Sequence, residues 1–228
     1  MILAINTSTT QFSIALMKEQ GDILAEYLIS PDEKNFKTFM PSVYSLFDTC
    51  GKDVKDLKAV VVARGPGSFT GLRVGLAMAK GMAHGLDIPI IGVSSLEAMA
   101  NQLPYMKYPL CTLMSSRRDE IIFALFKWND AKGITRLTED QSVKFKDLAG
   151  LIKGPTYFIG NNFTAQAPTV NELMGDKALL APQHLWALRA SSVGTLGIKR
   201  FVANDFDSIT DLVPEYLRPP DIRPNPFA

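Results

Sequence analysis

Short apolar runs separated by polar turns make up the first thirty residues of the chain. Strand-like runs over residues 1–6, 11–18 and 21–30 are joined by the polar turns 7–10 and 19–22. This spacing is typical of consecutive antiparallel hairpins. We therefore expect the chain to begin with three antiparallel strands.

The pattern then becomes an alternation of helices and strands. An apolar helix is predicted up to Cys50, where Gly51 is a C-cap signal, and two β-rich runs alternate with two further helices. This alternation favours parallel pairing of the strands. The predicted elements are helices over 36–50, 70–85 and 96–103 and strands over 58–64 and 88–93.

A second set of elements follows a break at residues 104–109. Its order is a looser version of the first half, although no residue-level repeat relates the two. The predicted elements are strands over 110–116, 120–128, 134–143 and 156–160 and helices over 145–153 and 189–204. We therefore predict an α/β fold with two lobes, each a mixed sheet flanked by helices.

We place the first lobe at residues 1–103 and the second at residues 104–228. The helix at about 189–204 is a candidate to pack back on the first lobe. Four prolines in the last eleven residues predict an extended tail over 218–228.

Composition narrows the class of protein without naming a ligand. The 228 residues are 46% hydrophobic and 21% charged, as in soluble globular proteins, and the formal net charge is +1. No overall field draws the chain to nucleic acid or membrane, so contact with RNA requires a local patch or a partner. The first apolar run is too short for a signal sequence or a membrane span, and we expect a cytoplasmic protein.

The most distinctive stretch is VVARGPGSFTGLRVGLAMAKGMA at residues 61–83. A phosphate-binding P-loop would need Lys and then Ser or Thr after Gly71, where this chain has Leu72 and Arg73. The dinucleotide pattern G-x-G-x-x-G fails because Gly71 comes one residue late. A weak anion site at the helix N-terminus, assisted by Arg64 and Arg73, is one reading, and we favour a structural strand-to-helix turn. The residues of that turn are Gly65, Pro66, Gly67, Ser68 and Thr70.

The helices before and after this loop are more apolar than one inward face requires. The second helix carries Gly75 and Gly81, although a glycine costs a helix up to about 1 kcal/mol, and small residues along one face would let another helix approach closely. A helix pair that offers an apolar patch to another protein is one hypothesis, and burial inside one lobe is the alternative. The candidate partner-interface residues are Phe36, Phe39, Met40, Val43, Phe47, Gly71, Val74, Gly75, Met78 and Met82.

A catalytic or metal-binding pattern is not found in the sequence. It contains no H-x-x-x-H pair and no Ser-His-Asp or Cys-His arrangement that can be nominated. His84 suits a helix C-terminus, His184 suits packing, and Cys50 and Cys111 lie in apolar runs typical of core thiols. We expect no catalytic residue, no metal and no cofactor.

The hydroxyl-rich turn after the first strand is the candidate vestigial nucleotide site, formed by Asn6, Thr7, Ser8 and Thr9. It resembles the phosphate loop of sugar kinases, actin and Hsp70-like ATPases, which have aspartate where this chain has Asn6. A carboxylate positions the magnesium shell in such sites, and Asn6 supplies no charge. We therefore expect weak or absent ATPase activity.

Three stretches together resemble one family, the TsaB (YeaZ) family of bacterial tRNA-modification proteins. They are ILAINTST at residues 2–9, the run over residues 61–100, and EYLR at residues 215–218. The likeness covers the first half nearly end to end and thins after Pro104. ARGPGSFTGLR, residues 63–73, is its most specific string.

This resemblance implies the two-lobed ASKHA fold of actin-like ATPases and a non-catalytic role. It implies a TsaD-like catalytic partner, which carries the metal-binding histidines, and a TsaE-like ATPase. Together they place a threonylcarbamoyl group on the adenosine next to the anticodon of tRNAs that read codons beginning with A. The helical face of the first lobe would form a homodimer or the TsaD heterodimer, with tRNA contacted indirectly through the complex.

Three positions depart from the family pattern. Aspartate is usual at Asn6, a His-Ser pair at Asn35-Phe36, and Asp-Ala-Arg is frequent at residues 115–117, which read Ser-Ser-Arg here. These changes bear on a nucleotide role and leave a scaffold role intact. The competing hypotheses are a stand-alone ATPase or small-molecule kinase of the same fold and a metalloprotease, for which the sequence lacks ligands.

Overall fold

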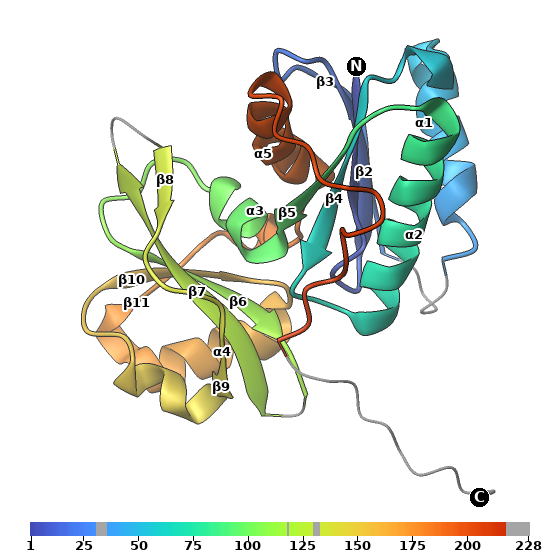
Figure 1. Ribbon diagram of the computed structural model, residues 1–228. Helices are drawn as coiled ribbons and strands as arrows, with labels where there is room; N and C mark the ends of the chain where they lie inside the picture. Colours follow the sequence, from blue (N-terminus) through green and yellow to red (C-terminus); the bar gives the residue numbers. More distant parts are fainter. Residues whose placement is uncertain (31–35, 118, 130–132, 218–228) are drawn as a thin grey trace, which may run out of the picture.

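Two mixed β-sheets form the framework of the molecule (Figure 1). The structure, a computed structural model, describes the chain except for residues 31–35, 118, 130–132 and 218–228. The predicted tail and Asn35 therefore lie outside the described residues. The two sheets and their helices confirm the predicted two-lobed α/β fold.

The first sheet has the strand order β3-β2-β1-β4-β5. Its first three strands form antiparallel hairpins, as predicted, whereas β4 pairs parallel with β1, and β5 pairs parallel with β4. Central strands of such a sheet are covered on both faces, and all five residues of β1 are buried. The bounds are β1 Ile2–Asn6, β2 Phe12–Met17, β3 Ile23–Ile29, β4 Ala59–Gly65 and β5 Ile90–Ser94.

Helices cover both faces of this sheet (Figure 1). Helices α1 (Phe39–Cys50) and α2 (Phe69–Leu86) pack on one face, and α5 (Ala190–Val202) packs on the other. Helix α1 ends as predicted, with Gly51 in the left-handed conformation at φ 59°. The short helix α3 (Ser95–Asn101) lies between the two sheets, where it contacts strands of both.

The second sheet has the order β11-β10-β6-β7-β8, and β9 also pairs with β7. Helix α4 and the 3-10 turn η2 cover the face that is lined by Cys111, Phe123 and Phe158. The bounds are β6 Leu110–Ser115, β7 Glu120–Asn129, β8 Gly133–Arg136, β9 Gln141–Lys144, η2 Phe145–Gly150, β10 Thr156–Gly160, α4 Phe163–Met174 and β11 Ala178–Leu180. The remaining 3-10 turns are η1 Val54–Asp56, η3 Gly175–Lys177 and η4 Gln183–Leu185.

The second lobe differs from the prediction in four places. The single strand expected over 134–143 is two strands, β8 and β9, which both pair with β7. The helix expected over 145–153 is only the 3-10 turn η2. Helix α4 was not predicted, because Pro168 lies inside it, and neither was β11, which has only three residues.

One apolar cluster runs through both lobes. It joins Ala4 and Val61 of the first sheet to Leu110 and Ile159 of the second, and Leu196 of α5 belongs to it. The two sheets therefore share an interior, with α3 and α5 inside the shared layer. The lobe boundary at residue 103 stays a prediction.

Candidate functional site

The glycine loop between β4 and α2 is a strand-to-helix turn with a side-chain cap. Gly65 has a φ of 127°, which favours glycine, and the Ser68 hydroxyl accepts a hydrogen bond from the Gly71 N–H at 3.3 Å. Ser68, and not Thr70, is therefore the N-cap of α2. The Ser68 N–H in turn donates to the carbonyl of Ser8 at 2.7 Å, so the loop is attached to the β1–β2 turn.

The β1–β2 turn packs against the side of α2 that carries Gly71 and Gly75. A Cβ atom on Gly71 would overlap the carbonyl oxygen of Thr7, and a Cβ atom on Gly75 would overlap the Thr7 hydroxyl. The same hydroxyl donates to the Gly71 carbonyl at 2.7 Å. The small residues on this side predict that another helix approaches it closely. This prediction is wrong, because the β1–β2 turn of the same chain occupies the space.

The four residues of the candidate nucleotide turn are buried, and their side chains are satisfied within the chain. The Asn6 amide donates to the Leu188 carbonyl at 3.0 Å, and its oxygen accepts from the Ser8 N–H at 3.0 Å and the Ser8 hydroxyl at 2.7 Å. The Thr9 hydroxyl donates to the Gln11 carbonyl at 2.6 Å. Asn6, Thr7, Ser8 and Thr9 have exposed fractions between 0 and 5%. Their side chains hold the turn against α2 and the segment before α5.

The predicted interface residues divide into an interior and a surface group. Phe39, Val43 and Phe47 of α1 are 1, 2 and 6% exposed and pack with the first sheet. With Gly71 and Gly75 they belong to the core and are not available to a partner. The structure therefore supports the alternative of burial for these five residues.

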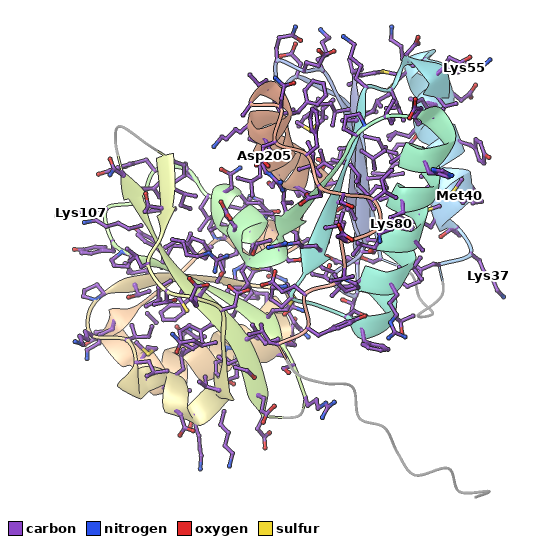
Figure 2. The ribbon with its side chains drawn as sticks, viewed as in Figure 1. Lys37, Met40, Lys55, Lys80, Lys107 and Asp205 are labelled. Carbon is purple, nitrogen blue, oxygen red and sulfur yellow. The ribbon has the colours of Figure 1, made fainter. Side chains whose placement is uncertain are left out.

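The surface group lies on or just before the same two helices, and Phe36, Met78 and Met82 in it also pack against the core of the first sheet. Phe36, Met40, Val74, Met78 and Met82 are half-buried, and Figure 2 shows Met40 at the outer side of the first lobe. Three small residues of α2 that were not predicted as interface residues, at spacings of four, are exposed. We call these the outer face of α2: Ala77, Gly81 and Gly85.

Helix α1 also carries one exposed aromatic side chain. Tyr44 is 70% exposed, although it is a large apolar side chain. Gly81 and Gly85 have no atom within 4 Å of the place where a Cβ would be. Unlike Gly71 and Gly75, these glycines are not required by any contact within the described chain.

A C-terminal strap, residues 203–217, crosses the first lobe to the glycine loop (Figure 1). The buried Leu212 lies against Gly92, and the Glu215 N–H donates to the Arg64 carbonyl at 2.8 Å. At its end the Tyr216 hydroxyl accepts from Arg73 at 3.0 Å. The strap thus fixes the loop from outside, a contact that the sequence stretch EYLR did not reveal.

An ionic cluster anchors the start of this strap. Arg200 pairs with Asp205 at 2.6 Å and with Asp207 at 3.0 Å. These hydrogen bonds raise the pKa of the Arg200 guanidinium and hold the pKa of the Asp205 carboxyl below its ordinary value. Asp207 also accepts from the Gly92 N–H at 2.7 Å, so the strap is pinned to β5.

A cleft of about 630 Å³ lies beside the strap and is bounded by both lobes. Its charges have both signs and are largely paired. Arg136 of the second lobe forms an ion pair with Asp140 and donates to the Ser94 hydroxyl of the first lobe at 3.0 Å. Arg64 lies near Glu215 at 3.4 Å. The cleft therefore connects the lobes and shows no preference for a ligand of one charge.

The remaining candidate residues are dispersed. His84 is exposed in the last turn of α2, His184 is exposed in η4, and burial raises the pKa of the Cys111 thiol. Ser115 is the first residue of the Ser-Ser-Arg stretch that departs from the family pattern. Its backbone N–H donates to the Asn161 side chain at 2.9 Å. Among the described residues no group of three or more histidine, cysteine or acidic side chains is placed to hold a metal, and no helix there is long and apolar enough to cross a membrane.

The sequence of this chain is similar to a family model and to known proteins. The family model described as TsaD, tRNA N6-adenosine threonylcarbamoyltransferase, matches residues 23–213. The tRNA threonylcarbamoyladenosine biosynthesis protein TsaB of Bacillus subtilis (strain 168) is 32% identical over 220 residues, which cover 95% of this chain and 93% of that protein.

Two solved structures show the fold. YeaZ from Pseudomonas aeruginosa has a TM-score of 0.78 at 20% identity and covers 95% of this chain and 99% of its own. The activator of the 2-hydroxyisocaproyl-CoA dehydratase from Clostridium difficile, with bound ADPNP, has a TM-score of 0.51 at 11% identity, over 91% of this chain and 98% of its own. The fold is thus of the ASKHA type, as predicted. The 32% sequence identity to the Bacillus protein over 95% of this chain, together with this fold, shows that the chain belongs to the TsaB family.

Proposed function

We propose that the chain is a non-catalytic subunit that binds and activates a TsaD-like catalytic subunit. The complex would threonylcarbamoylate the adenosine adjacent to the anticodon in tRNAs that read codons beginning with A. A TsaE-like ATPase would be the third component, and the chain alone would form a homodimer. Membership of the TsaB family, whose Bacillus member is named for this biosynthesis, supports the pathway.

The outer face of α2 is the observation that carries the binding role. Each glycine in a helix interior costs roughly 1 kcal/mol relative to alanine. Gly81 lies inside α2 and bears that cost, and neither Gly81 nor Gly85, the second-last residue of the helix, has a contact that needs its small size. A partner helix lying across Ala77, Gly81 and Gly85 would use the missing side chains. Half-buried Met78 and exposed Tyr44 would add apolar contact area at its edges.

The buried β1–β2 turn supports the non-catalytic part of the proposal. A nucleotide phosphate at this turn would compete with the contacts of Asn6 and Thr7 to Leu188 and α2. It would also meet no carboxylate at position 6 to position magnesium. The alternative function, a stand-alone ATPase or kinase, therefore requires the turn to leave α2. Calorimetry with Mg-ATP separates the two, because micromolar binding would favour the alternative.

Reconstitution with a TsaD-type subunit tests the proposal. The purified pair should run as a heterodimer by mass measurement, and transfer of the threonylcarbamoyl group to tRNA should depend on adding this chain. Ala77→Asp should abolish both, since it buries a charge at the contact. Asn171→Asp, at an exposed site on α4, is the matched control. Normal complex formation and normal modification with Ala77→Asp would refute the proposed surface.

A further inference from the structure

One end of the second sheet carries a row of lysines, which we call the lysine edge: Lys107, Lys127, Lys153 and Lys177. They lie in or just before four neighbouring strands, whose order is β11-β10-β6-β7. Lys107, Lys153 and Lys177 come just before the parallel strands β6, β10 and β11 begin, and Lys127 is near the end of antiparallel β7. The topology therefore brings four cations from distant parts of the sequence to one end.

The register supports this placement. Tyr157 pairs with Leu110, and Leu110 pairs with Phe126, so the residue after Phe126, Lys127, is level with the entry to β6. Neighbouring strands lie about 4.8 Å apart, so the four strands span roughly 15 Å. Figure 2 shows Lys107 at the outer end of this lobe, on the side away from the first sheet.

The lysines of this edge are exposed and form no ion pair among the described residues. In the first lobe, Lys18 pairs with Asp22 at 3.3 Å and Lys58 with Glu19 at 2.8 Å, while the exposed Lys52 and Lys55 are each followed directly by an aspartate in the chain. One described acid, Asp176, lies next to Lys177 in the chain. The uncompensated charge is therefore greatest at the other three positions. It is a local feature, because the whole chain has a net charge of only +1.

Aromatic side chains lie beside two of these lysines, Lys107 and Lys127. Tyr105 is 60% exposed, and it lines a hollow of about 510 Å³ with Lys107, Lys127 and Trp128. The Lys107 ammonium lies 5.7 Å from the centre of the Tyr108 ring. None of the described residues that line the hollow is acidic. An exposed ring beside unpaired cations suits a ligand that has both phosphates and planar bases.

We propose that the lysine edge binds the phosphate backbone of single-stranded or looped RNA, with Tyr105 as a platform for a base. In the pathway proposed above this RNA is the tRNA substrate, so the inference adds a direct tRNA contact to a chain expected to meet tRNA only through its partners. The edge belongs to the second lobe, whereas the outer face of α2 belongs to the first. One chain can therefore hold the catalytic subunit and RNA on separate surfaces.

Fluorescence anisotropy tests whether the lysine charges contribute to RNA binding. A fluorescently labelled tRNA transcript is titrated with the full chain, alone and with the catalytic subunit, at several salt concentrations. Lys107→Gln with Lys127→Gln should weaken binding roughly tenfold and reduce the slope of log affinity against log salt by about 1.4, since each lost phosphate contact removes about 0.7. Lys52→Gln with Lys55→Gln, at exposed lysines of the first lobe, is the matched control and should change neither.

The aromatic contact has a different signature. Tyr105→Ala should weaken binding about fivefold or more and leave the salt slope unchanged, because stacking releases no counterions. Tyr105→Phe should keep the affinity. The two kinds of variant thus separate charge from stacking in one assay.

Three results would overturn the proposal. They are absence of RNA binding by the wild-type chain, edge variants with the affinity and slope of the control, and edge variants that lose the catalytic subunit but keep RNA. The last result would assign the edge to the catalytic subunit. If the catalytic subunit fails to bind even the wild-type chain, the proposed function fails, while RNA binding by the chain alone still tests the lysine edge.

Discussion

Helix α2 carries two sets of small residues that look equivalent in the sequence and differ in the structure. Gly71 and Gly75 are buried, and the Thr7 turn fills the space that their missing side chains leave. Gly81 and Gly85 are exposed and border open space. Packing within the chain explains why glycine is needed at Gly71 and Gly75. No contact within the described chain explains Gly81, where glycine destabilises the helix, and this is a reason to look for a partner at that position.

The largest expected effect is a loss of stability on substitution of a buried glycine. Gly71→Ala places a methyl group on the Thr7 carbonyl, a backbone atom that cannot rotate away. We expect a loss of about 3 kcal/mol in the free energy of unfolding, as in overpacked cores, despite the better helix propensity of alanine. Urea unfolding measures it. Unchanged stability would show that the turn does not pack on α2 as described.

The next effect concerns the turn that fills the buried side. Asn6→Asp replaces an amide that donates to the Leu188 carbonyl with a buried carboxylate that cannot. We expect a loss of about 2 kcal/mol in unfolding free energy and no gain of Mg-ATP binding by calorimetry. The same change in Asn162→Asp should be nearly neutral, because aspartate caps α4 as well as asparagine does. Micromolar Mg-ATP binding by Asn6→Asp would contradict the account of a closed turn.

The smallest effect is on the exposed side and has the opposite sign. Gly81→Ala adds a methyl group where no atom lies within 4 Å. We expect the isolated chain to become more stable by about 0.5 to 1 kcal/mol, through helix propensity alone. Thermal unfolding of Gly81→Ala beside Gly71→Ala measures the contrast. Destabilisation by Gly81→Ala would mean that this face is already packed against something.

Most of the first lobe could be predicted from sequence because its signals are local. Hairpin spacing, the Gly51 cap and the β-rich runs each depend on neighbours along the chain, and the strands and helices they predict are present. The second lobe was harder, since Pro168 interrupts the pattern of α4 and a three-residue strand such as β11 has no period to detect.

The candidate site was predictable in kind and not in detail. The sequence indicates that α2 has small faces, but the occupant of a face is fixed by tertiary contacts, as between Thr7 and Gly75. For the same reason it could not show that Phe39 and Phe47 turn inward or that Tyr216 reaches Arg73. The lysine edge was also hidden, because only the strand order brings Lys107 near the other lysines.

One measurement tests the central claim, that the outer face of α2 is the partner surface. Gly81→Arg should leave unfolding of the isolated chain unchanged or slightly improved, since arginine is a good helix former and the site is open. In a titration of the TsaD-type subunit, followed by mass measurement of the mixture, the account predicts at least a hundredfold loss of affinity and two separate species. A heterodimer of wild-type affinity with Gly81→Arg would contradict it.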